Sequence, residues 1–128
     1  MTIRLKRVYE PASSDDGIRI LVERLWPRGV SKADAHIDRW LKAVAPSTDL
    51  RKWFNHDPAK WASFQERYAE ELRHNRSVVE ELLGLVSKNP VVTLVFAARD
   101  LEHNSAIVLK AFVEALTESS GAPQAFNA

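Results

Sequence analysis

The segment Val91–Ala97 (VVTLVFA) constrains the fold more than any other part of the sequence, because it is an almost continuous apolar run. Pro90 precedes it, and the charged pair Arg99 and Asp100 follows it closely. A short, valine-rich run of this kind is typical of a strand covered on both faces, as in a parallel sheet. A buried helix is the other interpretation, but Thr93 and the valines argue against it. We therefore predict a central parallel strand here.

Two more strands are predicted near the start of the chain. Ile3–Tyr9 begins with alternating apolar and basic residues, as a half-buried strand does. Ile18–Trp26 (IRILVERLW) is rich in the β-branched and aromatic residues that favour strands. Residues 10–17 are few for a crossover between parallel strands, so the relative direction of the two segments stays open.

Most of the remaining sequence has the spacing of amphipathic helices. Helix caps are expected at Ser47, Asp57 and Asn104, and Pro58 suits the first helical position. The predicted inward faces of the helices run through Ile37–Val44, Leu50–Phe54, Trp61–Leu72, Val79–Val86 and Ile107–Leu116.

These elements predict an α/β protein with a small, mostly parallel sheet flanked by helices, folded as a single three-layer domain. A chain of 128 residues is long enough for one domain with its own core. We expect this domain to span residues 1–118. Residues 119–128 carry no charged side chain and are expected to form a flexible C-terminal tail.

The composition excludes several classes of protein. Without cysteine the chain has no disulfide, no thiolate nucleophile and no cysteine-ligated zinc. No apolar run reaches the ~18 residues that span a membrane, and Met1–Arg7 lacks the apolar stretch of a signal peptide. We therefore expect a cytoplasmic protein without a membrane partner. The sequence leaves its oligomeric state open.

The charge balance does not favour nucleic acid as a partner, although it does not exclude one. The formal net charge is +1, whereas proteins that bind nucleic acid through its phosphates usually carry a basic excess. Tryptophans can serve as base-stacking platforms. Three of the four fall on predicted inward helix faces and are expected in the core: Trp40, Trp53 and Trp61.

The densest chemical feature is the turn that begins at Arg24 and runs through Trp26 and Arg28. Pro27 and Gly29 shape this turn, and it follows a predicted strand, where ligands of α/β proteins bind. Guanidinium groups suit carboxylate or phosphate ligands, so both arginines and Trp26 are candidate ligand-binding residues. In the alternative interpretation, Arg24 pairs with a protein carboxylate and Arg28 is only solvated.

A second group of candidates follows the central strand. Arg99 and Asn104 are candidate ligand-binding residues, and Asp100 is a candidate general base or ligand anchor. The helix that starts near Asn104 would favour anions at its N-terminus. In an alternative interpretation of equal weight, Asp100 only caps a turn and Asn104 only caps the helix.

A third group lies between two predicted helices. His56 is a candidate for proton transfer near neutral pH, although a histidine in such a connection is more often structural. Arg51 is a candidate ligand-binding residue or a surface side chain, and Asp57 is better explained as a helix cap.

No metal site and no cofactor are predicted. Asp34, His36 and Asp38 alternate, but such positions on a helix point ~100° apart per residue and do not converge on an ion. The chain contains neither a P-loop nor G-x-G-x-x-G, and it lacks the G-x-S-x-G of a serine hydrolase.

Several motifs together resemble the YeaO-like proteins, the family of domain of unknown function 488. They are RVYEP (7–11), DG (16–17), RLWPRG (24–29), APS (45–47), WFNHDPAKW (53–61), RY (67–68), VTLVFAARD (92–100) and HN (103–104). The resemblance covers about Ile3–Leu116 and implies a compact bacterial or archaeal cytoplasmic α/β domain with a parallel sheet. It implies no particular reaction, and the thiol chemistry open to members with cysteine is closed to this chain. The positions it carries over as candidates are Arg24, Trp26, Arg28, His56, Asp57, Asp100 and Asn104.

These observations lead to one main functional hypothesis and two alternatives. If the segments after Leu25 and Ala97 lie side by side, they form a site for a small anion, phosphate-like or nucleotide-like. Asp100 or His56 would move a proton there if the protein is an enzyme, which the sequence leaves open. The alternatives are a nucleic-acid-associated or regulatory module, which would use Lys32 and Lys42 besides the arginines, and an interaction domain whose arginines form buried ion pairs.

Overall fold

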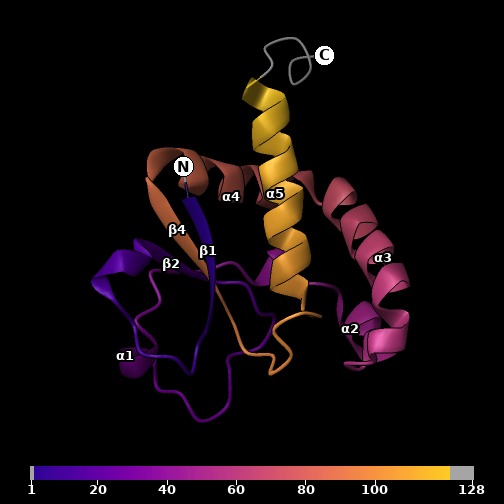
Figure 1. Cartoon of the computed structure of the whole chain (residues 1–128), viewed down its shortest axis with the longest axis horizontal. Helices are drawn as coiled ribbons and strands as arrows, with labels where there is room; N and C mark the ends of the chain where they lie inside the picture. The colour runs from indigo at the N-terminus through magenta and orange to yellow at the C-terminus, as the bar shows by residue number, and fades with distance from the viewer. Residues whose placement is uncertain (1, 122–128) are drawn as a thin grey trace.

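The computed structural model describes residues 2–121 and contains one sheet of four strands in the order β1-β4-β2-β3 (Figure 1). The strands are β1 (Thr2–Arg7), β2 (Ile18–Leu21), β3 (Arg39–Trp40) and β4 (Val91–Phe96). Every pair in the sheet is parallel. The predicted apolar run is a central strand, buried from Val92 to Phe96 between β1 and β2. The predicted α/β fold is confirmed.

β1 and β2 run in the same direction on the two sides of β4, which answers the question that residues 10–17 left open. Thr2 and Ile18 pair with Val91 and Val92, so both strands begin at the same end of the sheet. Residues 8–17 return the chain to that end, with a short 3₁₀ helix at Ser14–Asp16. A chain advances up to ~3.3 Å per residue, so this connection can span the sheet without a helix.

The first face of the sheet carries the main core. It is covered by α3 (Trp61–His74), α4 (Arg76–Lys88) and α5 (Ser105–Gly121), and α5 stands beside β1 in Figure 1. Alternate strand residues point into this core, among them Ile20, Val92 and Leu94, all fully buried. Tyr68 of α3 is buried in the same cluster and donates a hydrogen bond to the carbonyl of Val44 at 2.6 Å.

The predicted helix caps have the expected geometry. The Ser47 hydroxyl accepts a hydrogen bond from the N–H of Leu50 and begins α2 (Thr48–Phe54). Asp57 caps a 3₁₀ turn, Pro58–Lys60, that leads directly into α3. Asn104 accepts a hydrogen bond from the N–H of Ile107 at the start of α5.

The second face of the sheet carries a smaller core under α1 (Lys32–Ala35) and the loops around it. Leu21 and Val95 lie there beside Ala35, and Trp26 and Trp40 pack against them. Helices on one face and α1 with its loops on the other give the three layers.

A buried ion pair fills the rest of the second face. Asp16 and Arg19 are 3% and 4% exposed, and Arg19 Nη1 lies 2.6 Å from Asp16 Oδ2. Burial opposes ionisation of Asp16. Hydrogen bonds from the Ser13 N–H, Lys6 and Arg19 outweigh that effect and lower the pKa of Asp16. The Thr93 hydroxyl donates a hydrogen bond to the carbonyl of Asp16. This bond links the segment between β1 and β2 to β4.

The prediction of a helix over Ile37–Val44 is wrong. Arg39 and Trp40 form β3 instead, and only a 3₁₀ turn, Lys42–Val44, follows. The cause is long-range pairing, because the N–H groups of Asp38 and Leu41 donate to carbonyls of β2. Trp40 is therefore half-buried on a strand rather than on a helix face.

β2 ends at Leu21, earlier than the predicted Trp26. Residues 119–121 of the expected tail belong to α5, and residues 122–128 lie outside the described residues. Between residues 2 and 121, no helix is long and apolar enough to cross a membrane.

Candidate functional site

The ends of β2 and β4 lie side by side. The N–H of Val22 donates to the Val95 carbonyl at 3.1 Å, which extends the strand pairing by one residue. One residue later, Glu23 Oε2 accepts a hydrogen bond from the N–H of Ala97 at 3.0 Å. The Glu23 side chain thus replaces a backbone partner and holds the two chain segments together.

A pocket of about 590 Å³ opens beside this junction, at the carboxyl end of the sheet. Ligands of open α/β sheets usually bind at this edge. The pocket is lined by Glu23, Arg24, Ala45, Pro46, Arg51, Phe54, His56, Phe64, Ala97, Ala98, Arg99, Asp100, His103, Asn104 and Ser105. It therefore collects six of the eight predicted site residues from three separate parts of the chain.

Two arginines hold the loops that form the pocket. Arg24 donates from Nε to the carbonyl of Pro46 at 3.0 Å and from Nη2 to that of Ala45 at 2.9 Å. Arg7, at the end of β1, donates to the carbonyls of Ala97 and Ala98. Arg24 is thus not paired with a carboxylate but ties the segment that follows β2 to the loop before α2.

Arg51 and His56 reach the pocket from α2 and from the connection after it. Both side chains are exposed, and Asn55 and His56 adopt positive φ angles of 47° and 55° as the chain turns. Ser47, the cap of α2, also bonds through its N–H and hydroxyl to Glu71 of α3, so α2 is fixed at its start. Among residues 2–121, the Arg51 guanidinium has no hydrogen-bond partner and no close ion-pair partner.

Asp100 and Asn104 organise the loop between β4 and α5. Asp100 Oδ1 accepts hydrogen bonds from the N–H groups of Glu102 and His103, and Oδ2 lies 2.9 Å from His103 Nδ1. The hydrogen bond from the Glu102 N–H has the largest effect on the pKa of Asp100. Together with the contacts from His103, it lowers the pKa of Asp100. The amide of Asn104 donates to the Asp100 carbonyl. The capping interpretation of these two residues therefore agrees with the geometry.

His103 was not among the predicted site residues. Its ring is oriented by Asp100 and packs edge-on against Trp61, with ring centroids 5.2 Å apart, while the residue lines the pocket. In the sequence, the contact between Asp100 and His103 is indicated by their spacing of three residues within a loop.

Glu23 was also missed, although it stands directly before Arg24 at a predicted strand end. Burial raises the pKa of its carboxyl group. The Ala97 N–H and the positive charges of Arg51 and His56 oppose this rise. The pocket therefore contains a carboxyl group that is harder to ionise than an exposed glutamate.

Trp26 and Arg28 lie outside the pocket. The chain turns back after Arg24, and Trp26 packs edge-on against Trp40 at 5.4 Å while its Nε1 donates to the Val30 carbonyl. Arg28 is exposed, and only its carbonyl is bonded, to the Tyr9 hydroxyl.

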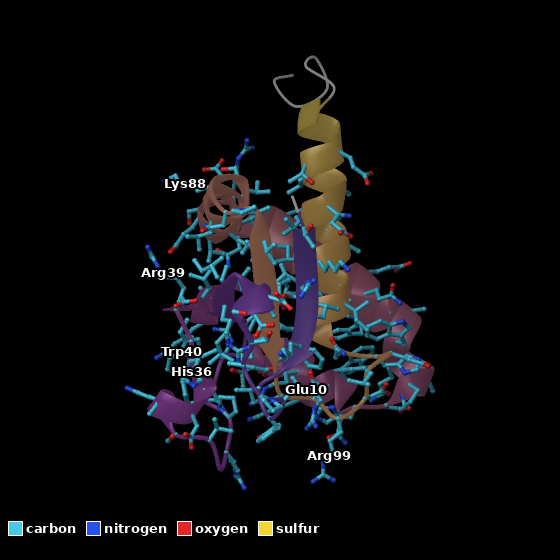
Figure 2. The ribbon with its side chains drawn as sticks, turned by 60° about the vertical axis from the view of Figure 1, so that its left-hand side comes forward. Glu10, His36, Arg39, Trp40, Lys88 and Arg99 are labelled. Carbon is cyan, nitrogen blue, oxygen red and sulfur yellow. The ribbon has the colours of Figure 1, made fainter. Side chains whose placement is uncertain are left out.

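Arg99 also lines the pocket. Figure 2 shows its side chain extending away from the ribbon, at a distance from the side where Trp40 and His36 lie. No carboxylate within the described part of the chain pairs with it. Among those residues there is also no cluster of His, Asp and Glu side chains that could hold a metal ion.

Residues 2–127 match the family model described as "Inactive DUF488-N3 subclade". The chain belongs to this family. It is 42% identical to the "Uncharacterized protein YeaO" of Escherichia coli K12 over 116 residues, which covers 91% of this chain and 100% of that protein. It is 44% identical to the "Uncharacterized protein Rv3073c" of Mycobacterium tuberculosis H37Rv, over 84% of this chain and 89% of that protein. No solved structure gives a significant match.

Proposed function

We propose that the pocket binds a small anionic molecule with an apolar body, such as a phosphorylated or nucleotide-like compound. The observation that carries this proposal is a pair of arginines, Arg51 and Arg99, that line the pocket without a close carboxylate partner among residues 2–121. Guanidinium groups form charge-assisted, often bidentate hydrogen bonds with phosphate and carboxylate groups. A volume of about 590 Å³ lies within the usual range for small-molecule sites.

The surroundings of the two arginines support the same ligand class. Ser105, the first residue of the 17-residue helix α5, lines the pocket, so the positive end of the helix dipole faces it. Phe54 and Phe64 together with Ala45, Pro46, Ala97 and Ala98 give apolar walls for the rest of the ligand. His56 would contact the ligand, whereas Asp100 and Asn104 would shape the loop around it.

We favour binding over catalysis. The family model carries the word "inactive" in its description. Both carboxylate oxygens of Asp100, the predicted general base, are engaged with Glu102 and His103. These contacts lower the pKa of Asp100, which makes its carboxylate a weaker base.

Isothermal titration calorimetry with adenosine monophosphate tests the proposal, with adenosine as the uncharged control ligand. We expect the nucleotide to bind and adenosine to bind more weakly. Arg51→Ala should weaken nucleotide binding about tenfold or more, the value of one charge-assisted hydrogen bond. Arg28→Ala removes another exposed arginine, one outside the pocket, and should leave binding unchanged.

Two results would reject this function. One is the absence of binding by either adenosine monophosphate or inorganic phosphate. The other is an equal loss in both arginine variants, which would indicate diffuse surface charge. If duplex or single-stranded DNA bound instead, with affinity falling steeply as salt rises, the nucleic-acid-associated alternative would be favoured.

A further inference from the structure

Glu23 has one oxygen that the protein itself does not use. Oε2 accepts the hydrogen bond from the Ala97 N–H, whereas Oε1 accepts none from any residue in the range 2–121. Within that range, every buried side-chain nitrogen or oxygen has a hydrogen-bond partner. Oε1 is therefore not buried, and because Glu23 lines the pocket, this oxygen is available from the pocket side.

The nearby cations do not supply the missing donor. Arg24, the next residue, uses Nε and Nη2 on the carbonyls of Pro46 and Ala45. Arg51 and His56 act on Glu23 through their charge but donate no hydrogen bond to it. Glu23 Oε1 is therefore an accessible acceptor that takes its donor from water or from a ligand.

The position of Glu23 also restricts the ligand. A molecule that is anionic throughout would be repelled where it approaches this carboxyl group. An anionic end held by Arg51 or Arg99 leaves the other end of the ligand free to meet Glu23. Since much of the pocket lining is apolar, we expect that other end to belong to an apolar body with at least one polar atom.

We propose that Glu23 selects ligands whose apolar body carries an N–H donor, such as the exocyclic amine of a purine nucleotide. This inference rests on the proposed anion-binding function and adds a second recognition point to it. Glu23 Oε1 accepts the hydrogen bond from the ligand N–H, while Oε2 keeps its bond to Ala97. The Glu23 side chain thus joins the ends of β2 and β4 and also recognises the ligand.

Two nucleotides that differ only in this donor provide the test. Adenosine monophosphate has the exocyclic amine, and purine riboside monophosphate lacks it. Calorimetry on the full chain should show that the wild type prefers adenosine monophosphate about tenfold or more, because a hydrogen bond to a charged acceptor is lost with the second nucleotide.

Glu23→Gln is the matched variant. Its amide oxygen can still accept from the Ala97 N–H, while its amide nitrogen presents a donor to the pocket where Glu23 presents an acceptor. We expect this variant to bind both nucleotides with no preference for the amine. A urea unfolding curve close to that of the wild type would show that the strand ends remain joined.

The dependence of the preference on pH gives a second measurement that needs no variant. Protonation of Glu23 weakens it as an acceptor, so the preference should decline as pH falls through the raised pKa of Glu23. Six other charged or titratable groups line the same pocket: Arg24, Arg51, His56, Arg99, Asp100 and His103. These groups affect the phosphate of both nucleotides alike, so their effect cancels in the ratio of the two affinities. In Glu23→Gln this ratio should not change with pH.

The outcomes separate this inference from the proposed function. If both nucleotides bind the wild type equally, or if Glu23→Gln keeps the preference, the role of Glu23 is refuted while the anion site stands. If neither nucleotide nor inorganic phosphate binds, the proposed function fails and this inference fails with it.

Discussion

Replacing Gly17 with alanine should destabilise the fold strongly, although the change adds one methyl group. Gly17 ends the connection between β1 and β2 with φ at +64° and ψ at −140°, a backbone region used almost only by glycine, where other residues are strained by about 1–3 kcal/mol. A Cβ atom at this position would lie 2.1 Å from the carbonyl oxygen of Val91 and 2.7 Å from its carbonyl carbon. Carbon atoms normally approach to only ~3.5 Å, so the backbone of the connection or of β4 would have to move.

The expected loss follows from these two contributions. Overpacking typically costs about 1–3 kcal/mol in addition to the backbone strain, so the total is about 2–6 kcal/mol. That is a large fraction of the about 5–15 kcal/mol that stabilises an ordinary domain. Urea unfolding followed by tryptophan fluorescence measures the loss as a lower midpoint.

Gly29→Ala is the control for this experiment. Gly29 also has a positive φ, 76°, but apart from Gly29 and its two chain neighbours no atom of the described residues lies within 4 Å of the position that a Cβ would take. It should therefore lose only the strain of about 1–2 kcal/mol. Equal losses in the two variants would refute the argument that the close approach to Val91 requires glycine.

Three further predictions concern buried polar groups. Asp16→Asn leaves the buried Arg19 without its charged partner and should cost about 3–5 kcal/mol by urea unfolding. The pKa of Asp16 in the folded protein lies below its ordinary value of 3.8. The Asp16 carboxylate therefore stabilises the fold fully above pH 3.8, and this stabilisation is lost as pH falls through the folded pKa. Unfolding of Asp16→Asn in acid should not show this pH-dependent loss of stability. Tyr68→Phe leaves the Val44 carbonyl unpaired and should cost about 1–2 kcal/mol in chemical unfolding, whereas no loss would mean that water replaces the hydroxyl. Asn104→Ala removes the cap of α5 and should cost about 1–2 kcal/mol, and Asn104→Asp should restore much of it if capping is its role.

Features set by neighbouring residues could be predicted from the sequence. Val91–Phe96 is a central strand because burial on both faces requires an apolar run, and that requirement is visible in the residues themselves. Ser47 and Asp57 were identified as caps because a cap bonds to N–H groups only two or three residues away. Such local rules need no knowledge of the rest of the fold.

Features set by distant parts of the chain could not be predicted in the same way. The two residues of β3 are a strand only because β2 offers carbonyl and N–H groups beside them. Glu23 and Ala97 are 74 residues apart, and the bond between them depends on which strands are neighbours. The sequence predicts Trp26 at the site because it stands at the expected end of a strand beside two arginines, but its indole packs edge-on against Trp40 instead.

Because the pocket wall is assembled from segments far apart in the sequence, its occupancy is coupled to global unfolding. A ligand that binds only the native chain raises the free energy of unfolding by RT ln(1 + [L]/Kd), about 2.7 kcal/mol at a hundredfold excess over Kd. Melting temperature in the presence of a library of metabolites would therefore report ligands of this pocket without any assay of activity. Parallel melts of Arg51→Ala would separate compounds that use the pocket from those that bind elsewhere.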